Sequence, residues 1–293
     1  MLQWILDILR GVVIGVSNII PGVSGGTMAV SMGIYDRIIY DVNNIRKQFK
    51  KVFMDLLPIL IGLLVGLFAF AALIGMLLGT DSDTIPLTRL PTNFAFIGLI
   101  LGGLPVIFKR VNMKKAGVPG IVVFIAFFAL VVVLPLLTAP EARVVDHSFV
   151  NMLIMIVLGA IASSAMVIPG ISGSMIIMLL GYYDSIINAM NELRHGDFSA
   201  LALLLPYVIG LLIGIVFIAK LMNFLLKEHT TLTFCAIFGL VIGSPVALLV
   251  QNTDCFAIAN PGNWVISIVC CLAGFVVAYL LSRLEKDDSQ KDG

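Results

Sequence analysis

Charge is what this 293-residue sequence has least of. Asp, Glu, Lys and Arg make up 12% of its residues, 60% are hydrophobic, and the mean hydropathy is +1.09. A soluble domain of this size carries about 25% charged residues. The few charges lie between long apolar runs, which predicts an all-α polytopic integral membrane protein. The net charge of +1 leaves no global basic field that would indicate a nucleic-acid partner.

Cysteine and histidine are also scarce, and neither forms a recognisable metal-binding pattern. The four cysteines show no CxxC or other ligand spacing, and three of them lie in apolar runs. The three histidines lie in expected loops. The sequence therefore predicts no metal site, no cofactor and no catalytic residue.

Long apolar runs supply the expected membrane-spanning helices. Each is about long enough to cross a hydrocarbon core of about 30 Å. They cover residues 53–79, 93–108, 118–138, 201–226, 232–250 and 263–282. Two further apolar stretches, 8–40 and 149–190, are interrupted by proline and glycine.

Basic residues are concentrated in the loops of one side. They follow or precede the expected spans at 46–51, 109–115, 227 and 283–286, whereas the loops of the other side contain more acidic than basic residues. Loops that face the cytoplasm are enriched in Lys and Arg. This bias predicts that both termini are cytoplasmic.

The chain contains an internal repeat. Residues 19–46 align with 167–194 without gaps, at an offset of 148, and twelve of the 28 positions are identical. We therefore expect a first repeat over 1–148 and a second over 149–293. Three spans, an odd number, separate the two copies, so the repeats are expected to have inverted topology. Inverted repeats with broken helices are a recurrent architecture of transporters.

The best-matched part of the repeat reads PGVSGG at 21–26 and PGISGS at 169–174. Pro21 and Pro169 should each end a helix, and Ser24 and Ser172 should cap new helices over 25–35 and 173–183. Backbone amides exposed at such helix starts favour an anion. We expect two re-entrant hairpins that enter from opposite faces and meet, although two full-length spans per stretch fit the charges equally well.

Several polar residues accompany these breaks. Arg10 lies in an apolar run, where it is expected to pair with the anion or with Asp7, or to reach the cytoplasmic surface. Asp36 and Asp184 occupy matching positions and are either coupling-ion ligands or polar helix ends. The predicted substrate-binding residues are Arg10, Asn18, Pro21, Gly22, Ser24, Gly25, Gly26, Thr27, Pro169, Gly170, Ser172, Gly173 and Ser174.

The pairing of NIIPGVSGGTMAVSMGIYD with VIPGISGSMIIMLLGYYD resembles the bacterial polyprenyl-phosphate transporter family. The resemblance covers nearly the whole chain and includes Arg10-Gly11. It implies a flippase of the bacterial cytoplasmic membrane. Such a protein returns undecaprenyl phosphate from the outer to the inner leaflet, so that this carrier lipid is recycled for cell-wall and surface-polymer synthesis.

Two other functions were considered. An undecaprenyl pyrophosphate phosphatase has an arginine where this chain has Gly25 and Gly173, and it uses glutamates in a membrane helix. The four glutamates here lie in loops or the tail, which argues against hydrolysis. An ion-coupled transporter of a small soluble anion would instead need a cavity that is sealed from lipid.

Overall fold

The computed structural model describes residues 2–19, 24–78, 87–111, 113–137, 143, 145 and 148–289, and the regular elements among them are all helices. The first half contains α1 (Leu2–Ile19), α2 (Gly25–Ser31), α3 (Tyr35–Asn44), α4 (Phe49–Leu78), α5 (Arg89–Arg110), α6 (Met113–Val133) and the 3-10 turn η1 (Leu134–Leu136). The second half contains α7 (Phe149–Val167), α8 (Gly173–Leu179), α9 (Tyr183–Arg194), η2 (Phe198–Ala200), α10 (Leu201–Glu228), α11 (Thr230–Gln251), α12 (Asp254–Ile258) and α13 (Pro261–Ser289). The predicted all-α class is confirmed.

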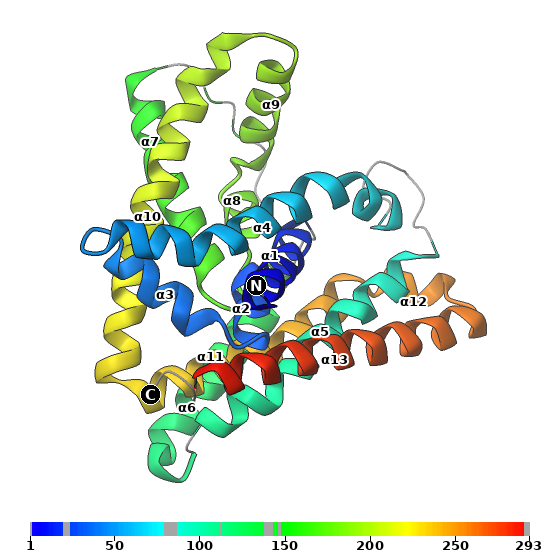
Figure 1. Ribbon diagram of the computed structural model, residues 1–293. Helices are drawn as coiled ribbons and strands as arrows, with labels where there is room; N and C mark the ends of the chain where they lie inside the picture. Colours follow the sequence, from blue (N-terminus) through cyan, green and yellow to red (C-terminus); the bar gives the residue numbers. More distant parts are fainter. Residues whose placement is uncertain are drawn as a thin grey trace.

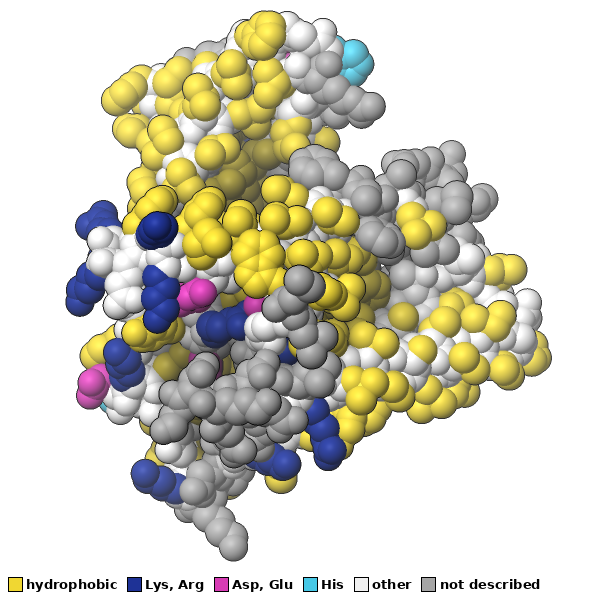
Figure 2. Space-filling view, in the orientation of Figure 1, with side chains coloured by type: hydrophobic (Ala, Val, Ile, Leu, Met, Phe, Trp, Pro, Cys, Tyr) yellow, Lys and Arg dark blue, Asp and Glu magenta, His cyan; other side chains and the backbone are white. Residues whose placement is uncertain are grey.

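Six helical segments among the described residues are long and apolar enough to cross a membrane. Five of them match the predicted spans, and α4 occupies the remaining predicted span, 53–79. The additional segment is α7, Phe149–Val167, which the sequence placed in the second hairpin. Because α7 has 19 residues and rises about 28 Å, it is long enough to cross the core alone. Many apolar side chains of these helices face outward, as Figure 2 shows over the upper helices and the lower right edge.

The helices form two groups with the first four helices between them (Figure 1). In the first half α1 packs along α4, and in the second half α7 packs along α10. The contacts repeat at the sequence offset. A Cβ on Gly11 would overlap the carbonyl oxygen of Ile59, and one on Gly159 would overlap that of Tyr207, 148 residues later in each case. The internal repeat is therefore also a repeat of backbone packing.

The remaining pairs cross between the halves. Helix α5 packs along α13, and α6 packs along α11, while α5 and α11 touch each other. Glycines permit the close approach: a Cβ on Gly98 of α5 would overlap the backbone of Cys271 in α13. The last helix of each half thus packs on a helix of the other half (Figure 1).

The helices after the two breaks are shorter than predicted. Helix α2 ends at Ser31 and α8 at Leu179, so each has seven residues, about 10 Å of rise, instead of the expected eleven. Gly33 and Gly181 follow them with φ of 80° and 81°. The amides of Gly33 and Ile34 donate to the carbonyls of Val30 and Ala29, a Schellman end that recurs at Gly181. The prediction of helices over 25–35 and 173–183 was wrong because these glycines stop both.

Candidate functional site

The two breaks in the apolar stretches lie against each other. The backbone amide of Gly170 donates a buried hydrogen bond of 2.6 Å to Oγ1 of Thr27. The Ser24 hydroxyl lies 3.5 Å from the carbonyl oxygen of Ile168, to which it donates a long hydrogen bond. A Cβ on Gly26 would lie 2.8 Å from the carbonyl oxygen of Val167, so only glycine fits there without a shift. The two breaks, whose bonded residues Thr27 and Gly170 lie 143 positions apart in the sequence, are therefore in buried contact.

Two of the backbone amides that were expected to bind an anion instead donate hydrogen bonds to side chains of the protein. The Gly25 amide donates to Oδ1 of Asn18 at 3.2 Å, and the Gly170 amide donates to Thr27. Ser24 and Ser172 occupy the predicted N-cap positions, but neither side chain makes a capping hydrogen bond. Helices of seven residues also have little dipole to contribute. Two of the amides in the expected anion site are therefore not free in this structure.

The second break has fewer polar contacts. The hydroxyls of Ser172 and Ser174 lie 2.9 Å apart and form a hydrogen bond. Gly173 is buried, and a Cβ there would overlap the carbonyl of Ala162. Ser174 is exposed and lines a separate cavity of about 300 Å³ with Met178, Tyr183 and Gln251 among others. Pro169 is buried between the two breaks, whereas the predicted site residues Pro21 and Gly22 lie outside the described residues.

An apolar cavity of about 220 Å³ reaches the first break. Helices α1, α2, α3, α4, α7 and α10 all contribute to its walls. Its lining is almost entirely apolar and includes Ile14, Ile39, Leu56, Ile59, Leu63 and Val167. The polar exceptions are Asn18, Tyr35 and Ser163, together with the backbone of Gly25 and Gly26. The cavity therefore offers an apolar volume with a few polar groups in its wall.

Asn18 carries the polar chemistry at that point. Its Oδ1 accepts from Gly25, while its Nδ2 is buried and has no hydrogen-bond partner among the described residues. A buried donor that lacks an acceptor costs about 1–3 kcal/mol. Asn18 is thus a residue of the predicted set that lines the cavity and has a buried polar atom without a hydrogen-bond partner among the described residues.

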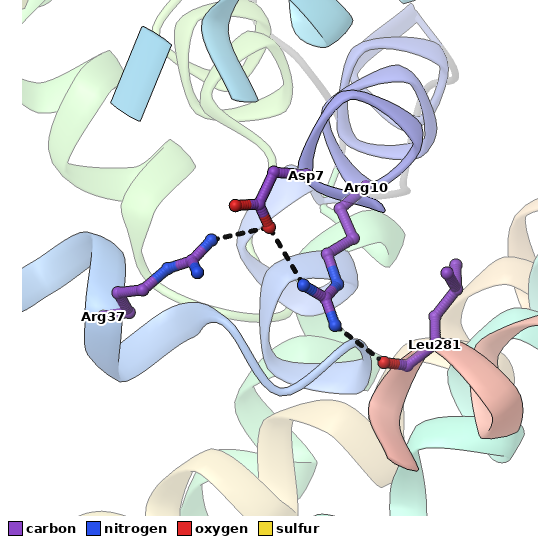
Figure 3. Close-up of polar contacts among 4 residues, drawn as sticks. All are labelled: Asp7, Arg10, Arg37 and Leu281. Carbon is purple, nitrogen blue, oxygen red and sulfur yellow. Dashed lines mark hydrogen bonds and ion pairs between the residues drawn. The ribbon is translucent and has the colours of Figure 1, made fainter. Parts of the chain in front are cut away.

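Arg10 belongs to a separate buried cluster that joins α1, α3 and α13 (Figure 3). Its guanidinium donates to Asp7 at 2.9 Å and to the carbonyl oxygen of Leu281 at 2.9 Å. Arg37 donates to the same oxygen of Asp7 at 2.7 Å. Arg10 is fully buried and Asp7 is 4% exposed. Two guanidinium groups therefore contact one carboxylate oxygen.

Asp36 and Asp184 lie in the first turns of α3 and α9. Acidic residues at a helix start are favoured by the helix dipole. Asp36 also forms an ion pair with Arg110 at the end of α5, and Arg110 lies over the Phe234 ring of α11. Asp184 is exposed. Both positions fit the interpretation as polar helix ends, and neither aspartate lines the apolar cavity.

The pairing of Arg10 with Asp7 was one of the alternatives expected from the sequence, and the structure contains it. Sequence reasoning missed Arg37 as the third member of this cluster, and it did not recognise Tyr35 and Ser163 as cavity residues. The apolar face of Ile38, Ile39 and Val42 could have indicated that α3 contacts more than water. Among the described residues, no group of three or more His, Cys, Asp or Glu could hold a metal ion.

Comparisons with known proteins agree on one family. A family model described as undecaprenyl phosphate translocase-like matches residues 14–265. A polyprenyl-phosphate transporter of Staphylococcus aureus is 32% identical over 291 residues, which is 98% of both chains. A polyprenyl-phosphate transporter of Vibrio cholerae is 27% identical over 322 residues, covering 96% of this chain and 97% of the relative. No solved structure matches.

Proposed function

The chain belongs to the undecaprenyl phosphate translocase-like family, and we propose that it moves undecaprenyl phosphate from the outer to the inner leaflet of the cytoplasmic membrane. The returned lipid re-enters cell-wall and surface-polymer synthesis. The protein acts without hydrolysing the phosphate.

The observation that carries this proposal is the apolar cavity that Asn18 helps to line. A polyprenyl phosphate has a charged head group on an apolar chain, so its site needs an apolar volume next to a hydrogen-bond donor. The isoprene units nearest the head group would occupy the volume between α3, α4, α7 and α10. The phosphate would accept from Nδ2 of Asn18, whose second polar atom is already held by Gly25.

Arg10 and Arg37 would attract the head group to this end of the protein. Both guanidinium groups contact Asp7, and Arg10 is fully buried, where charges interact more strongly than in water. The two N–H groups of one guanidinium fork can donate to two phosphate oxygens. We therefore assign the cluster to electrostatic recruitment rather than to the site in the cavity.

The two halves would alternate in giving access to the two leaflets. The basic loops of one side support opposite orientations of the repeats, with both termini in the cytoplasm. The buried contact between Thr27 and Gly170 joins the two breaks in the arrangement described here. Opening toward one leaflet would require this contact to shift.

The test is a leaflet-resolved transport assay with purified protein in vesicles that contain labelled undecaprenyl phosphate. A phosphatase that cannot cross the membrane is added outside. In protein-free vesicles it should reach only the lipid of the outer leaflet. In vesicles with the wild-type protein, the inner pool should also become accessible. An identical time course with and without protein would overturn the proposal.

Variants of Asn18 refine this assay. Asn18→Met introduces the residue at the matching position of the second half, Met166, and should slow transport about tenfold or more, because each lost hydrogen bond to a charged group removes about 1.5–3 kcal/mol. Asn18→Asp keeps the oxygen that accepts from Gly25 but has no Nδ2 donor, and it should be equally slow. Release of inorganic phosphate by the protein alone would instead indicate a phosphatase.

The direction of transport needs a separate experiment in cells. In bacteria that lack this protein and any protein that can replace it, undecaprenyl phosphate should accumulate in the outer leaflet. Expression of the wild-type chain should return it to the inner leaflet. Accumulation in the inner leaflet would contradict the proposed direction.

A further inference from the structure

Asp41 is a buried carboxyl group outside the site described above. It lies on α3 and is 6% exposed, and its Oδ2 has no hydrogen-bond partner among the described residues. Burial of an ionised carboxylate costs several kcal/mol unless partners compensate for the lost water. Asp41 therefore needs an explanation that packing alone does not provide.

The surroundings of Asp41 contain charges of both signs. Arg37 lies one turn earlier on the same helix, and Asp55 and Lys51 act on Asp41 from α4. Helix α10 also packs on α3, and its charged residues Lys220, Lys227 and Glu228 are exposed. Helix α2, which follows α1, has no charged residue. Repulsion from Asp55 thus favours the protonated form of Asp41, whereas attraction to Arg37 and Lys51 favours the ionised form.

The repeat shows that the fold does not require acids at these positions. The residues 148 positions after Asp41 and Asp55 are Ala189 and Leu203, which are 2% and 6% exposed. The second half packs the same pair of helices with apolar side chains. The carboxyl groups of the first half therefore carry chemistry that its counterpart lacks.

The cavity lies next to Asp41 along α3 and next to Asp55 along α4. Ile38, Ile39 and Val42 of α3 line the cavity on either side of Asp41 in the sequence, and the α4 wall begins at Leu56, next to Asp55. A movement of α3 away from α4 that widens the cavity would also bring water to Asp41. The charge on Asp41 and the width of the cavity are thus connected through one helix.

We propose that Asp41 is a proton-binding site that couples the position of α3, and with it access to the lipid cavity, to protonation. This inference rests on the proposed function and deepens it. The protonated carboxyl favours the closed packing described here. Loss of the proton favours an opened α3 in which water solvates the carboxylate, and by linkage a ligand that opens α3 promotes loss of the proton.

The pH range follows from the environment. Burial first, and then repulsion from Asp55, raise the pKa of Asp41 from 3.8 to about 6, against the attraction of Arg37 and Lys51. An acid whose pKa is raised in the folded protein stabilises it below the unfolded pKa, and this stability is lost as the pH rises through the folded pKa. The closed state should therefore weaken between about pH 4 and about pH 6 and stay weak above this range.

The first test measures the thermal unfolding of the purified protein in detergent at a series of pH values. The wild-type melting temperature should fall by about 3–6 °C as the pH rises from about 4 to about 7. Asp41→Asn, which resembles the protonated acid, should remove this fall. Asp41→Ala introduces the residue of the matching position, Ala189, and should also remove the fall. It provides a second test if Asp41→Asn folds poorly.

A matched control uses the neighbouring acid. Asp55→Asn removes the repulsion that raises the pKa of Asp41, so the midpoint of the fall should move to lower pH. The same fall in wild type and in both Asp41 variants would overturn the proposal. A midpoint that moves to higher pH in Asp55→Asn would overturn it as well.

The second test repeats the vesicle assay across the same pH range. Wild-type transport should slow below about pH 6, because the protonated form stays closed. Asp41→Asn should be slow at every pH and should show no such dependence. If wild type moves no lipid at any pH, the proposed function fails. If wild type transports and Asp41→Asn has the same pH profile, only the proton site fails.

Discussion

Corresponding positions in the two halves bury charged side chains in the first and apolar side chains in the second. The pairs are Asp7 and Met155, Arg10 and Leu158, and Asp41 and Ala189. The apolar members belong to or adjoin a compact core between α7, α9 and α10. Because the second half packs without these charges, the same backbone arrangement is stable in their absence. The difference indicates that the first half carries buried charges that this backbone arrangement does not need for packing.

The two breaks differ in the same way. Asn18 and Thr27 accept from backbone amides of the first and second break, respectively. Their counterparts 148 residues later are Met166 and Met175, which have no oxygen to accept with. The first half thus supplies a side-chain acceptor for one backbone amide of each break. Substitutions that exchange residues between the halves test how far this division extends.

The largest expected effect concerns the orientation of the halves, which is an all-or-none result. In a variant without native cysteines, single cysteines at positions 48 and 112 should be shielded from an impermeant reagent applied to intact cells. Cysteines at 82, 144 and 196 should react. Reaction of positions 48 and 196 from the same side would contradict inverted repeats, and reagent applied to inverted vesicles supplies the control.

The next effect comes from the buried charge cluster. Arg10→Leu should abolish nearly all transport and also destabilise the fold by about 3–5 kcal/mol, because it removes one partner of a buried ion pair. Arg10→Lys keeps the charge without the planar fork and should retain partial transport. Thermal unfolding and the vesicle assay measure the two effects.

A double variant separates folding from transport in this cluster. Asp7→Met with Arg10→Leu copies the apolar pair of the second half and should recover much of the lost melting temperature. Transport should remain low, since the recruiting charge is still missing. Wild-type transport in the double variant would mean that Arg10 serves only as a structural anchor.

A smaller effect is expected where the breaks meet. Thr27→Val leaves the buried Gly170 amide without its acceptor and should cost about 1–3 kcal/mol in unfolding free energy. Thr27→Ser retains the hydroxyl and should be close to wild type in denaturant unfolding. Equal stability of the two variants would show that the hydrogen bond between the halves contributes little.

The smallest effect concerns the serines before α2 and α8. Ser24→Ala removes a long hydrogen bond to Ile168, and Ser172→Ala removes the contact with Ser174. Since neither side chain caps a helix, each change should weaken head-group binding by only about 1 kcal/mol. Titration of the lipid in the vesicle assay measures this, and a tenfold loss of affinity or more for either serine would restore the anion site expected from the sequence.

The sequence predicted the helical class, the spans and the two breaks because each of these depends on residues close together in the chain. Apolar runs define the spans, and proline with glycine defines the breaks. The ends of α2 and α8 are also set by nearby residues, Gly33 and Gly181. The sequence prediction did not recognise these glycines as helix stops.

The distant partners of Arg10 and Thr27 could not be predicted, for a different reason. Arg10 donates to Leu281, 271 residues away in the sequence, and Thr27 accepts from Gly170, 143 residues away. Such contacts depend on how the helices pack, and hydropathy carries no information on that. The apolar cavity is formed by six helices, so no single segment could indicate it.

The crossed packing of α5 on α13 and of α6 on α11 has a consequence for how the chain is made. During synthesis α5 emerges before α13, so the glycine face around Gly98 meets its partner helix only when α13 is inserted. The first half therefore reaches its final packing only after the last helix of the second half is in place, and a chain that stops before α13 should be degraded faster than the full-length chain.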